Sequence, residues 1–316
     1  MKYILRFLAC FGLLICSYGQ ASAQYSNPIL TAPHDVQGAA LGQVSILADE
    51  MPIYSMPSLV LRQKEDKRLR LAYSFGLTPE ARSKQVQYYH RLASAYRFKD
   101  SQALMLGVRY WQGAPTPYVN TTITTLGVVV PQDWTIDVSY AYAFIPVLRF
   151  SVGVSYLNTY SSQTSHSVMA HLGASYEGAL SFLKQGEYLV GLSANNLGSK
   201  LYFGKEKKSV NTLPTYIEGA ARLGCSPWLE HKIRLGMALR YYSTMSGAQA
   251  FVYQTGLEYQ LRDIVALRLG GIYQEDNSQM TLGLGRDFGR ISLSVAYSLH
   301  NYAQFNVLNA GLSLSL

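Results

Sequence analysis

The C-terminal part of this 316-residue chain alternates between apolar residues and small or polar residues with a period of two. In residues 290–299, Ile, Leu, Val, Tyr and Leu occupy every second position, and Arg, Ser, Ala and Ser lie between them. Residues 307–316 repeat the pattern, with mostly Leu against Asn, Gly and Ser. Because successive side chains of a strand point to opposite faces, both segments predict strands with one oily face and one small or polar face.

Residues 1–23 predict an export signal that is removed from the mature chain. Two basic residues precede a mostly apolar stretch, and Ala21-Ser22-Ala23 has the small residues of a cleavage site. The apolar stretch is too short for a membrane-spanning helix. Cys16 leaves a lipoprotein as an alternative, which the bulky Ile15 before it disfavours.

Alternating segments continue through most of the chain and predict a membrane barrel. No later stretch has about 18 consecutive apolar residues, so strands rather than helices must cross a membrane, and they must close on themselves to pair every backbone group. We predict an all-β fold, a transmembrane antiparallel β-barrel of about 14 strands in one domain, residues 63–316. The predicted strands are 68–75, 85–98, 102–111, 134–144, 148–156, 168–177, 187–195, 215–224, 232–242, 249–260, 264–273, 279–288, 290–299 and 307–316.

Residues 118–130 are ambiguous, because their Thr-rich run suits a strand or a long loop. Single-chain bacterial barrels have even strand numbers, which favours fourteen strands without this segment. Short connections at 99–101, 262–263 and 288–289 predict one barrel end. Longer ones at 113–117, 159–166, 197–213 and 274–278 predict the outward end.

Residues 24–62 differ from the rest because they are apolar, poorly alternating and contain four prolines. Proline is a poor residue for a strand interior. The segment predicts a plug or hatch inside the barrel or across its mouth, and a disordered leader is the alternative.

The composition excludes several classes of function. The 25 Tyr residues suit the rims of a membrane barrel. Removing the signal leaves 25 basic and 19 acidic residues, with no basic stripe typical of nucleic-acid binding. The lysine-rich residues 205–208 predict a solvated loop. Cys225 is the only cysteine after the signal, so no internal disulfide is expected.

No catalytic or metal-binding motif is present, so we expect no enzyme activity, no cofactor and no metal. The six His residues are scattered without metal-ligand spacing. A barrel hydrolase would need a Ser and a His brought together on neighbouring strands, which the sequence leaves open.

Two sets of residues are candidates for a functional site. Inward strand positions carry arginines, which either line a lumen for anions or pair with acids such as Asp137, Glu218 and Glu258. The lumen-facing candidates are Arg70, Arg109, Arg149, Arg234, Arg240 and Arg268. Aromatic residues expected in loops suit a binding surface or the membrane rim. The loop candidates are Tyr118, Tyr160, Tyr202, Phe203 and Tyr242.

Four stretches in order resemble the PorV/PorQ family, outer-membrane barrels of the type IX secretion system of Bacteroidetes that are related in fold to FadL-type transporters. They are PHDVQGAALGQVSILAD at 33–49, ALMLGVRY at 103–110, IDVSYAY at 136–142, and GLSANNLG at 191–198 followed by Leu213-Pro214. The chain departs from the family at Ser55-Met56-Pro57, where members usually carry an Asn-Pro-Ala type of stretch. The PorP/SprF family of the same secretion system is the alternative family.

The resemblance implies a non-enzymatic component of protein secretion or cell-surface attachment in the outer membrane. Its partners would be outer-membrane lipid, secretion-system proteins and the C-terminal domains of secreted cargo, held by extracellular loops. The alternative is a FadL-like transporter of hydrophobic small molecules with residues 24–62 as a movable hatch.

Overall fold

The computed structural model describes residues 27–316, except residues 34, 49, 63–67, 81–84, 120–124, 204–208, 246, 263, 276 and 302–305. The predicted export signal and the lysine-rich run therefore lie outside the described residues. No helix among the residues that the structure describes is long and apolar enough to span a membrane.

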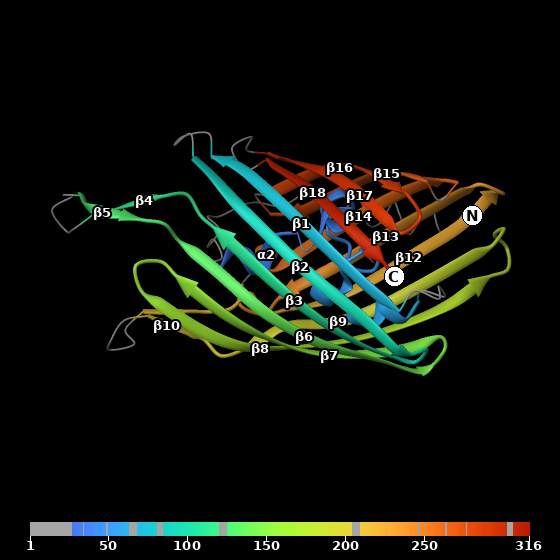
Figure 1. Ribbon diagram of the computed structural model, residues 1–316, viewed down its shortest axis with the longest axis horizontal. Helices are drawn as coiled ribbons and strands as arrows, with labels where there is room; N and C mark the ends of the chain where they lie inside the picture. The colour runs from blue at the N-terminus through green and yellow to red at the C-terminus, as the bar shows by residue number, and fades with distance from the viewer. Residues whose placement is uncertain are drawn as a thin grey trace.

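Fourteen antiparallel strands form a closed barrel, which confirms the predicted fold class and strand number. Each strand pairs with its neighbour along the chain, and pairing of the first strand with the last closes the wall. Figure 1 shows the strands tilted around the N-terminal residues, drawn in blue. The barrel strands are β1 (Leu69–Glu80), β2 (Gln85–Lys99), β3 (Gln102–Gln112), β6 (Gln132–Ile145), β7 (Leu148–Tyr160), β8 (Thr164–Leu180), β9 (Gly186–Gly198), β12 (Tyr216–Trp228), β13 (His231–Tyr242), β14 (Phe251–Leu261), β15 (Val265–Gln274), β16 (Asn277–Asp287), β17 (Ile291–His300) and β18 (Val307–Ser315).

The alternation in the sequence becomes the inside and outside of this wall. On β3, Leu104, Leu106 and Val108 are exposed on the outer surface, whereas Met105 and Arg109 are buried on the inner side. The other barrel strands expose similar apolar residues, which form the lipid-facing band that an outer-membrane barrel requires. The chain is therefore an outer-membrane protein.

Aromatic residues lie near both ends of the outer surface. Toward one end, the hydroxyl of Tyr73 lies 2.8 Å from Nδ1 of His90, and toward the other, the hydroxyl of Tyr259 lies 2.6 Å from Nδ1 of His231. Such amphipathic rings suit the two membrane interfaces.

The described residues among 118–130 form neither a barrel strand nor an irregular loop. They belong to a separate hairpin of β4 (Thr116–Val119) and β5 (Thr125–Val129), which projects beyond the barrel in Figure 1. A second small sheet, β10 (Leu201–Phe203) with β11 (Ser209–Asn211), and the short helix η3 (Gly247–Ala250) lie at the same end. Two of the predicted long connections were wrong, because β7 and β8 are joined by residues 161–163 and β15 and β16 by residues 275–276. The opposite end of the barrel has the predicted short turns, and the first strand starts and the last strand ends there. We call it the short-turn end.

Residues 27–62 contain α2 (Pro28–Thr31), α3 (Val36–Ala40), η1 (Pro52–Tyr54) and η2 (Pro57–Arg62). We call residues 27–62 the luminal segment. Its prolines start three of these short helices, where a missing backbone N–H costs nothing.

Candidate functional site

The luminal segment crosses the interior of the barrel from one wall to the other. The helix α3 contacts β15 to β18, and η2 contacts β2, β3 and β6 to β8 on the far side. Its apolar side chains, among them Leu41, Ile46, Leu47, Met56 and Leu59, are buried. The segment therefore fills the middle of the lumen (Figure 1).

Inward-facing glycines let this segment lie directly against the wall. Gly236, Gly256 and Gly270 lie opposite one another across β13, β14 and β15. A Cβ atom on Gly256 would lie 2.6 Å from the carbonyl oxygen of Leu41, and one on Gly270 would overlap the backbone of Leu41 and Gly42. We call Gly236, Gly256, Gly270, Gly283 and Gly311 the glycine strip, because each would meet the luminal segment with any larger side chain.

The backbone of the luminal segment turns sharply where it meets the strip. Gly42 has a φ of +63°, in the left-handed region that glycine tolerates best. Its N–H donates to Oγ1 of Thr281 at 3.1 Å, and that hydroxyl donates to the carbonyl oxygen of Ala40 at 2.9 Å. The contact is thus a close backbone approach fixed by one wall side chain.

A buried network of charges holds the segment on the side of the short-turn end. Glu258, which is 1% exposed, pairs with Arg234 and with Arg268, the latter at 2.8 Å. Gln37 donates to Glu258 at 3.4 Å, and Arg268 reaches Glu50 of the segment at 3.4 Å. Two wall arginines are therefore tied to the segment through these acids.

The other predicted lumen-facing arginines are also inside, and most carry ion pairs. Arg109 pairs with Asp137 at 2.8 Å, Arg240 with Glu218 at 2.7 Å, and Arg149 with Glu177 at 2.6 Å. Arg70 lines a cavity at the short-turn end. Asp137 and Glu218 were among the acids that the sequence offered as partners, whereas Glu177 was not.

Sequence reasoning missed three further interior arginines. Arg62 of the segment bridges Glu177 at 3.0 Å and Glu187 at 2.5 Å. Arg222 is among the most buried side chains and contacts Glu187 at 3.0 Å. Arg91 is buried with its guanidinium 5.2 Å from the ring centre of Tyr89. Each occupies an inward position of an alternating strand or the end of η2, so alternation alone would have identified the two on strands.

Two regions of different character lie toward the two ends of the lumen. At the short-turn end lies a cavity of about 970 Å³, which we call the vestibule. Its lining includes Arg62, Arg70, Glu177, Glu187, Glu258 and Arg268. Toward the outward end, an apolar cluster packs around α2. We call this cluster the outer chamber: Ile29, Leu30, Tyr89, Trp111, Leu157, Met169, Leu201 and Leu213.

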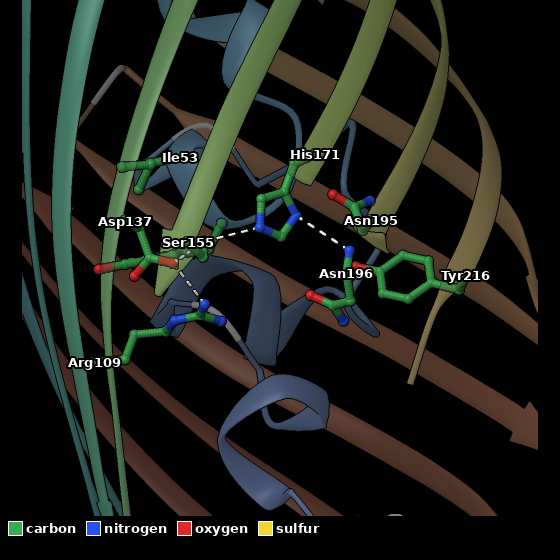
Figure 2. A pocket seen from close by; sticks show the side chains of 9 residues that line it. Ile53, Arg109, Asp137, Ser155, His171, Asn195, Asn196 and Tyr216 are labelled. Atoms are coloured by element: carbon green, nitrogen blue, oxygen red, sulfur yellow. Dashed lines mark hydrogen bonds and ion pairs between the residues drawn. The ribbon is translucent and has the colours of Figure 1, made fainter. Parts of the chain in front are cut away.

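An irregularity in the wall lies beside the luminal segment, between β8 and β9. The register shifts between Ala170 and Leu172, and Asn196 has a φ of +57°. The backbone N–H of Asn196 donates to Nδ1 of His171 at 3.3 Å instead of to a neighbouring strand. Figure 2 shows His171 between Asn196 on one side and Ser155 with Asp137 on the other. A side chain thus bridges the seam in the wall.

The hydrogen-bond order at this seam argues against a nucleophilic serine. The hydroxyl of Ser155 contacts Asp137, a carboxylate that can only accept, so it donates there. His171 Nε2, 2.8 Å from the same hydroxyl, must then be the donor, while Nδ1 accepts from Asn196. An imidazole that donates to the hydroxyl cannot take its proton, which is the reverse of a Ser–His catalytic pair.

The aromatic loop candidates lie in different environments. Tyr160, the last residue of β7, and Tyr202, in β10, are both exposed. Tyr118 and Phe203 belong to β4 and β10, and their side chains lie outside the described part of the chain. Tyr242 was placed wrongly as a loop residue. It faces inward at the end of β13, is buried, and its hydroxyl lies 3.2 Å from Nη1 of Arg240.

Known structures with a similar fold include hydrocarbon channels and transporters. The toluene transporter TodX of Pseudomonas putida has a TM-score of 0.55 and 12% sequence identity over 89% of this chain and 97% of that one. The Ralstonia pickettii toluene transporter TbuX has a TM-score of 0.55 and 10% identity over 90% and 99%. This chain shares its fold with these transporters. A TodX mutant described as a monoaromatic hydrocarbon channel reaches a TM-score of 0.59 at 12% identity, over 89% of this chain and 98% of that chain.

Sequence comparisons give no closer relationship. No protein-family model matches the sequence, and no curated protein matches it. At 10–12% identity the likeness to the channels concerns the fold alone.

Replacing His171 by leucine should destabilise the barrel by about 2–4 kcal/mol, because the N–H of Asn196 and the hydroxyl of Ser155 each lose a buried partner. Guanidinium unfolding in detergent micelles, followed by tryptophan fluorescence, would measure the change. The matched control is His166→Leu on the exposed outer face of the same strand, expected to change stability by less than about 0.5 kcal/mol. Equal effects of the two substitutions would contradict a bridging role for His171.

The luminal segment should be held more tightly in acid than at neutral pH. Burial, and next the charge of Glu50, raise the pKa of Asp35 in the segment from 3.8 to about 6, although its carboxylate accepts from Gly38 and Met51. A raised pKa in the docked state means that docking is most stable below about pH 4 and weakens as the pH rises through 6. The loss amounts to about 3 kcal/mol. Protease protection of the segment between pH 4 and 7 would measure it, and Asp35→Asn should remove this dependence; a profile that Asp35→Asn leaves unchanged would exclude Asp35 as its source.

Proposed function

We propose that this chain is an outer-membrane channel for hydrophobic small molecules, closed in this structure by the luminal segment. The observation that carries the proposal is the position of that segment between an apolar outer chamber and a charged vestibule. A molecule entering from outside meets apolar side chains first, and it has to displace the segment before it reaches the vestibule. The architecture shared with toluene transporters supports a small hydrophobic substrate.

The seam between β8 and β9 is the second feature that suits such a channel. One side of it faces lipid, and His171 and Asn196 bridge it in place of regular strand pairing. Regular ladder pairing is interrupted here between Ala170 and Leu172. The seam is closed in this structure, so passage of a ligand into the bilayer would require His171 to move.

A reversible lock between the segment and the wall tests the proposal. A Cβ on Gly311 would lie 3.5 Å from Cβ of Val36, within the range that a disulfide spans. In a Cys225→Ser background, we expect the Val36→Cys, Gly311→Cys double variant to take up radiolabelled toluene when reduced. After oxidation, uptake by intact cells that lack other hydrocarbon channels should fall at least tenfold. Each single-cysteine variant, given the same oxidant, is the control. Unchanged uptake by the fully oxidised double variant would contradict passage through the lumen.

The second candidate is a scaffold for type IX secretion or cell-surface attachment, as the resemblance to PorV/PorQ implies. Two observations favour it. The segment that carries the first stretch of the resemblance is packed in the lumen, and two hairpins, β4–β5 and β10–β11, extend from the outward end, where a partner could bind them. Affinity purification from outer membranes tests it. Recovery of secretion-system or surface proteins would support the scaffold, and a monomer carrying a hydrophobic ligand would support the channel.

Both proposals are non-enzymatic. The donor order at Ser155 and His171 supports this.

A further inference from the structure

Four buried side chains form a row inside the outer chamber. Tyr89, Trp111, Asp133 and Thr159 are cross-strand partners on the neighbouring strands β2, β3, β6 and β7. All four face inward and are buried, and Asp133 is only 2% exposed. A carboxylate therefore sits at the edge of an otherwise apolar cluster.

Two polar atoms in this row are poorly partnered, although the hydroxyl of Tyr89 interacts with the indole of Trp111. Nε1 of Trp111 and Oδ2 of Asp133 make no hydrogen bond of normal geometry. A buried donor or acceptor without a partner costs the full penalty of its desolvation, so such atoms need an explanation. Here one is a donor and the other an acceptor, and their residues are directly opposed across β3 and β6.

The space beside this pair is occupied by α2, whose buried side chains Ile29 and Leu30 offer only apolar surface. Leu157 and Met169 complete the apolar surroundings. The tight packing of the indole against the wall orients it, because a Cβ on Gly113 would lie 2.7 Å from the ring. The outer chamber thus combines an apolar wall with one oriented donor and one acceptor.

We infer that the outer chamber binds a small hydrophobic molecule that carries a hydroxyl group, such as a phenol or an alcohol. The apolar part takes the place of Ile29 and Leu30. The hydroxyl donates to Oδ2 of Asp133 and accepts from Nε1 of Trp111. This inference rests on the proposed channel function and names the class of its substrate.

Other ligand classes fit the pair less well. A plain hydrocarbon leaves both polar atoms without partners, and sites built to bond a hydroxyl strongly disfavour analogues that lack it. A carboxylate has no proton to donate to Oδ2 of Asp133. Arg91, the cation in the adjacent inward layer, lies toward Tyr89, at 5.2 Å from its ring centre. Whether a carboxylate reaches Arg91 is an outcome of the experiment below.

Three matched probes test the inference on the full mature chain in detergent, with Kd measured by titration calorimetry. They are toluene, p-cresol and p-toluate, which share a methylated ring and differ in the polar group. We expect p-cresol to bind at least tenfold more tightly than toluene, and p-toluate to bind most weakly. Trp111→Phe keeps an aromatic ring but removes the N–H donor. It should raise the Kd of p-cresol at least fivefold and change the Kd of toluene less than twofold. Asp133→Asn should reduce the difference in Kd between p-cresol and p-toluate.

Trp228→Phe, on the exposed rim of β12, is the control and should leave all three affinities unchanged. Equal affinity of toluene and p-cresol, tightest binding of p-toluate, or an unchanged p-cresol affinity in Trp111→Phe would each overturn the inference while leaving the channel in place. If none of the three probes binds, the inference falls together with the proposed binding of hydrophobic molecules.

Discussion

Replacing Gly270 by leucine should open the barrel. A Cβ at this position would fall on the backbone of Leu41 and Gly42, and backbone atoms cannot rotate away as a side chain can. The nearest atom of the wall is Oγ1 of Thr281, at 2.5 Å, and that side chain can rotate away. The luminal segment should therefore move away from the glycine strip. The channel conductance in planar bilayers should then rise at least tenfold over the wild type.

The neighbouring residue gives the matched control. Gly271 faces the outer surface, where an added Cβ would make only ordinary contacts, the nearest at 3.4 Å from Oγ1 of Thr255. Gly271→Leu adds the same side chain on the lipid side and should leave the conductance at the wild-type level. A folded, inserted Gly270→Leu barrel with wild-type conductance would show that the glycine strip does not seat the segment.

Replacing Glu258 by leucine should lower the free energy of unfolding by about 3–5 kcal/mol. Removing one partner of a buried ion pair leaves the opposite charge without compensation, and Glu258 serves both Arg234 and Arg268. The substitution also removes the contact of Gln37 with the wall, so the segment should become more accessible to protease. Guanidinium unfolding in micelles measures the first effect.

An exposed ion pair at the short-turn end provides the comparison. Arg262 and Glu230 lie 2.6 Å apart, but their side chains are 62% and 49% exposed. Water and salt screen such a pair, so Glu230→Gln should cost less than about 1 kcal/mol. If both substitutions had the same small effect, the interior network would not hold the segment.

The fold was predictable from the sequence because a membrane barrel has a strict period. One face of every strand must be apolar for lipid, and the opposite face is free of that demand, so alternation identifies both strand number and inward positions. The arginines on β3 and β13 were assigned to the interior for this reason. Their partners were harder to assign, because a pairing such as Arg240 with Glu218 depends on the register between strands.

The errors have physical causes as well. Tyr241 and Tyr242 are consecutive at a strand end, and only one of them can face outward. The hairpin of β4 and β5 satisfies its own backbone outside the barrel, so its sequence resembles a barrel strand that has no place in the wall. At the seam, Asn195-Asn196 was a usable signal, because asparagine tolerates the left-handed backbone that breaks a strand. Mid-strand glycines at inward positions likewise indicated where the luminal segment contacts the wall.

Labelling of one buried position most directly tests whether residues 27–62 close the lumen. Ser45 lies in the segment, is 4% exposed, and its hydroxyl has no hydrogen-bond partner, so Ser45→Cys is a nearly isosteric change. In intact cells and a Cys225→Ser background, a membrane-impermeant maleimide should fail to modify this cysteine, while it modifies Ser161→Cys in the exposed turn between β7 and β8 within minutes. The Gly270→Leu substitution should make position 45 reactive. Equal labelling rates at positions 45 and 161 in an otherwise unaltered, folded barrel would contradict a lumen closed by its own N-terminal residues.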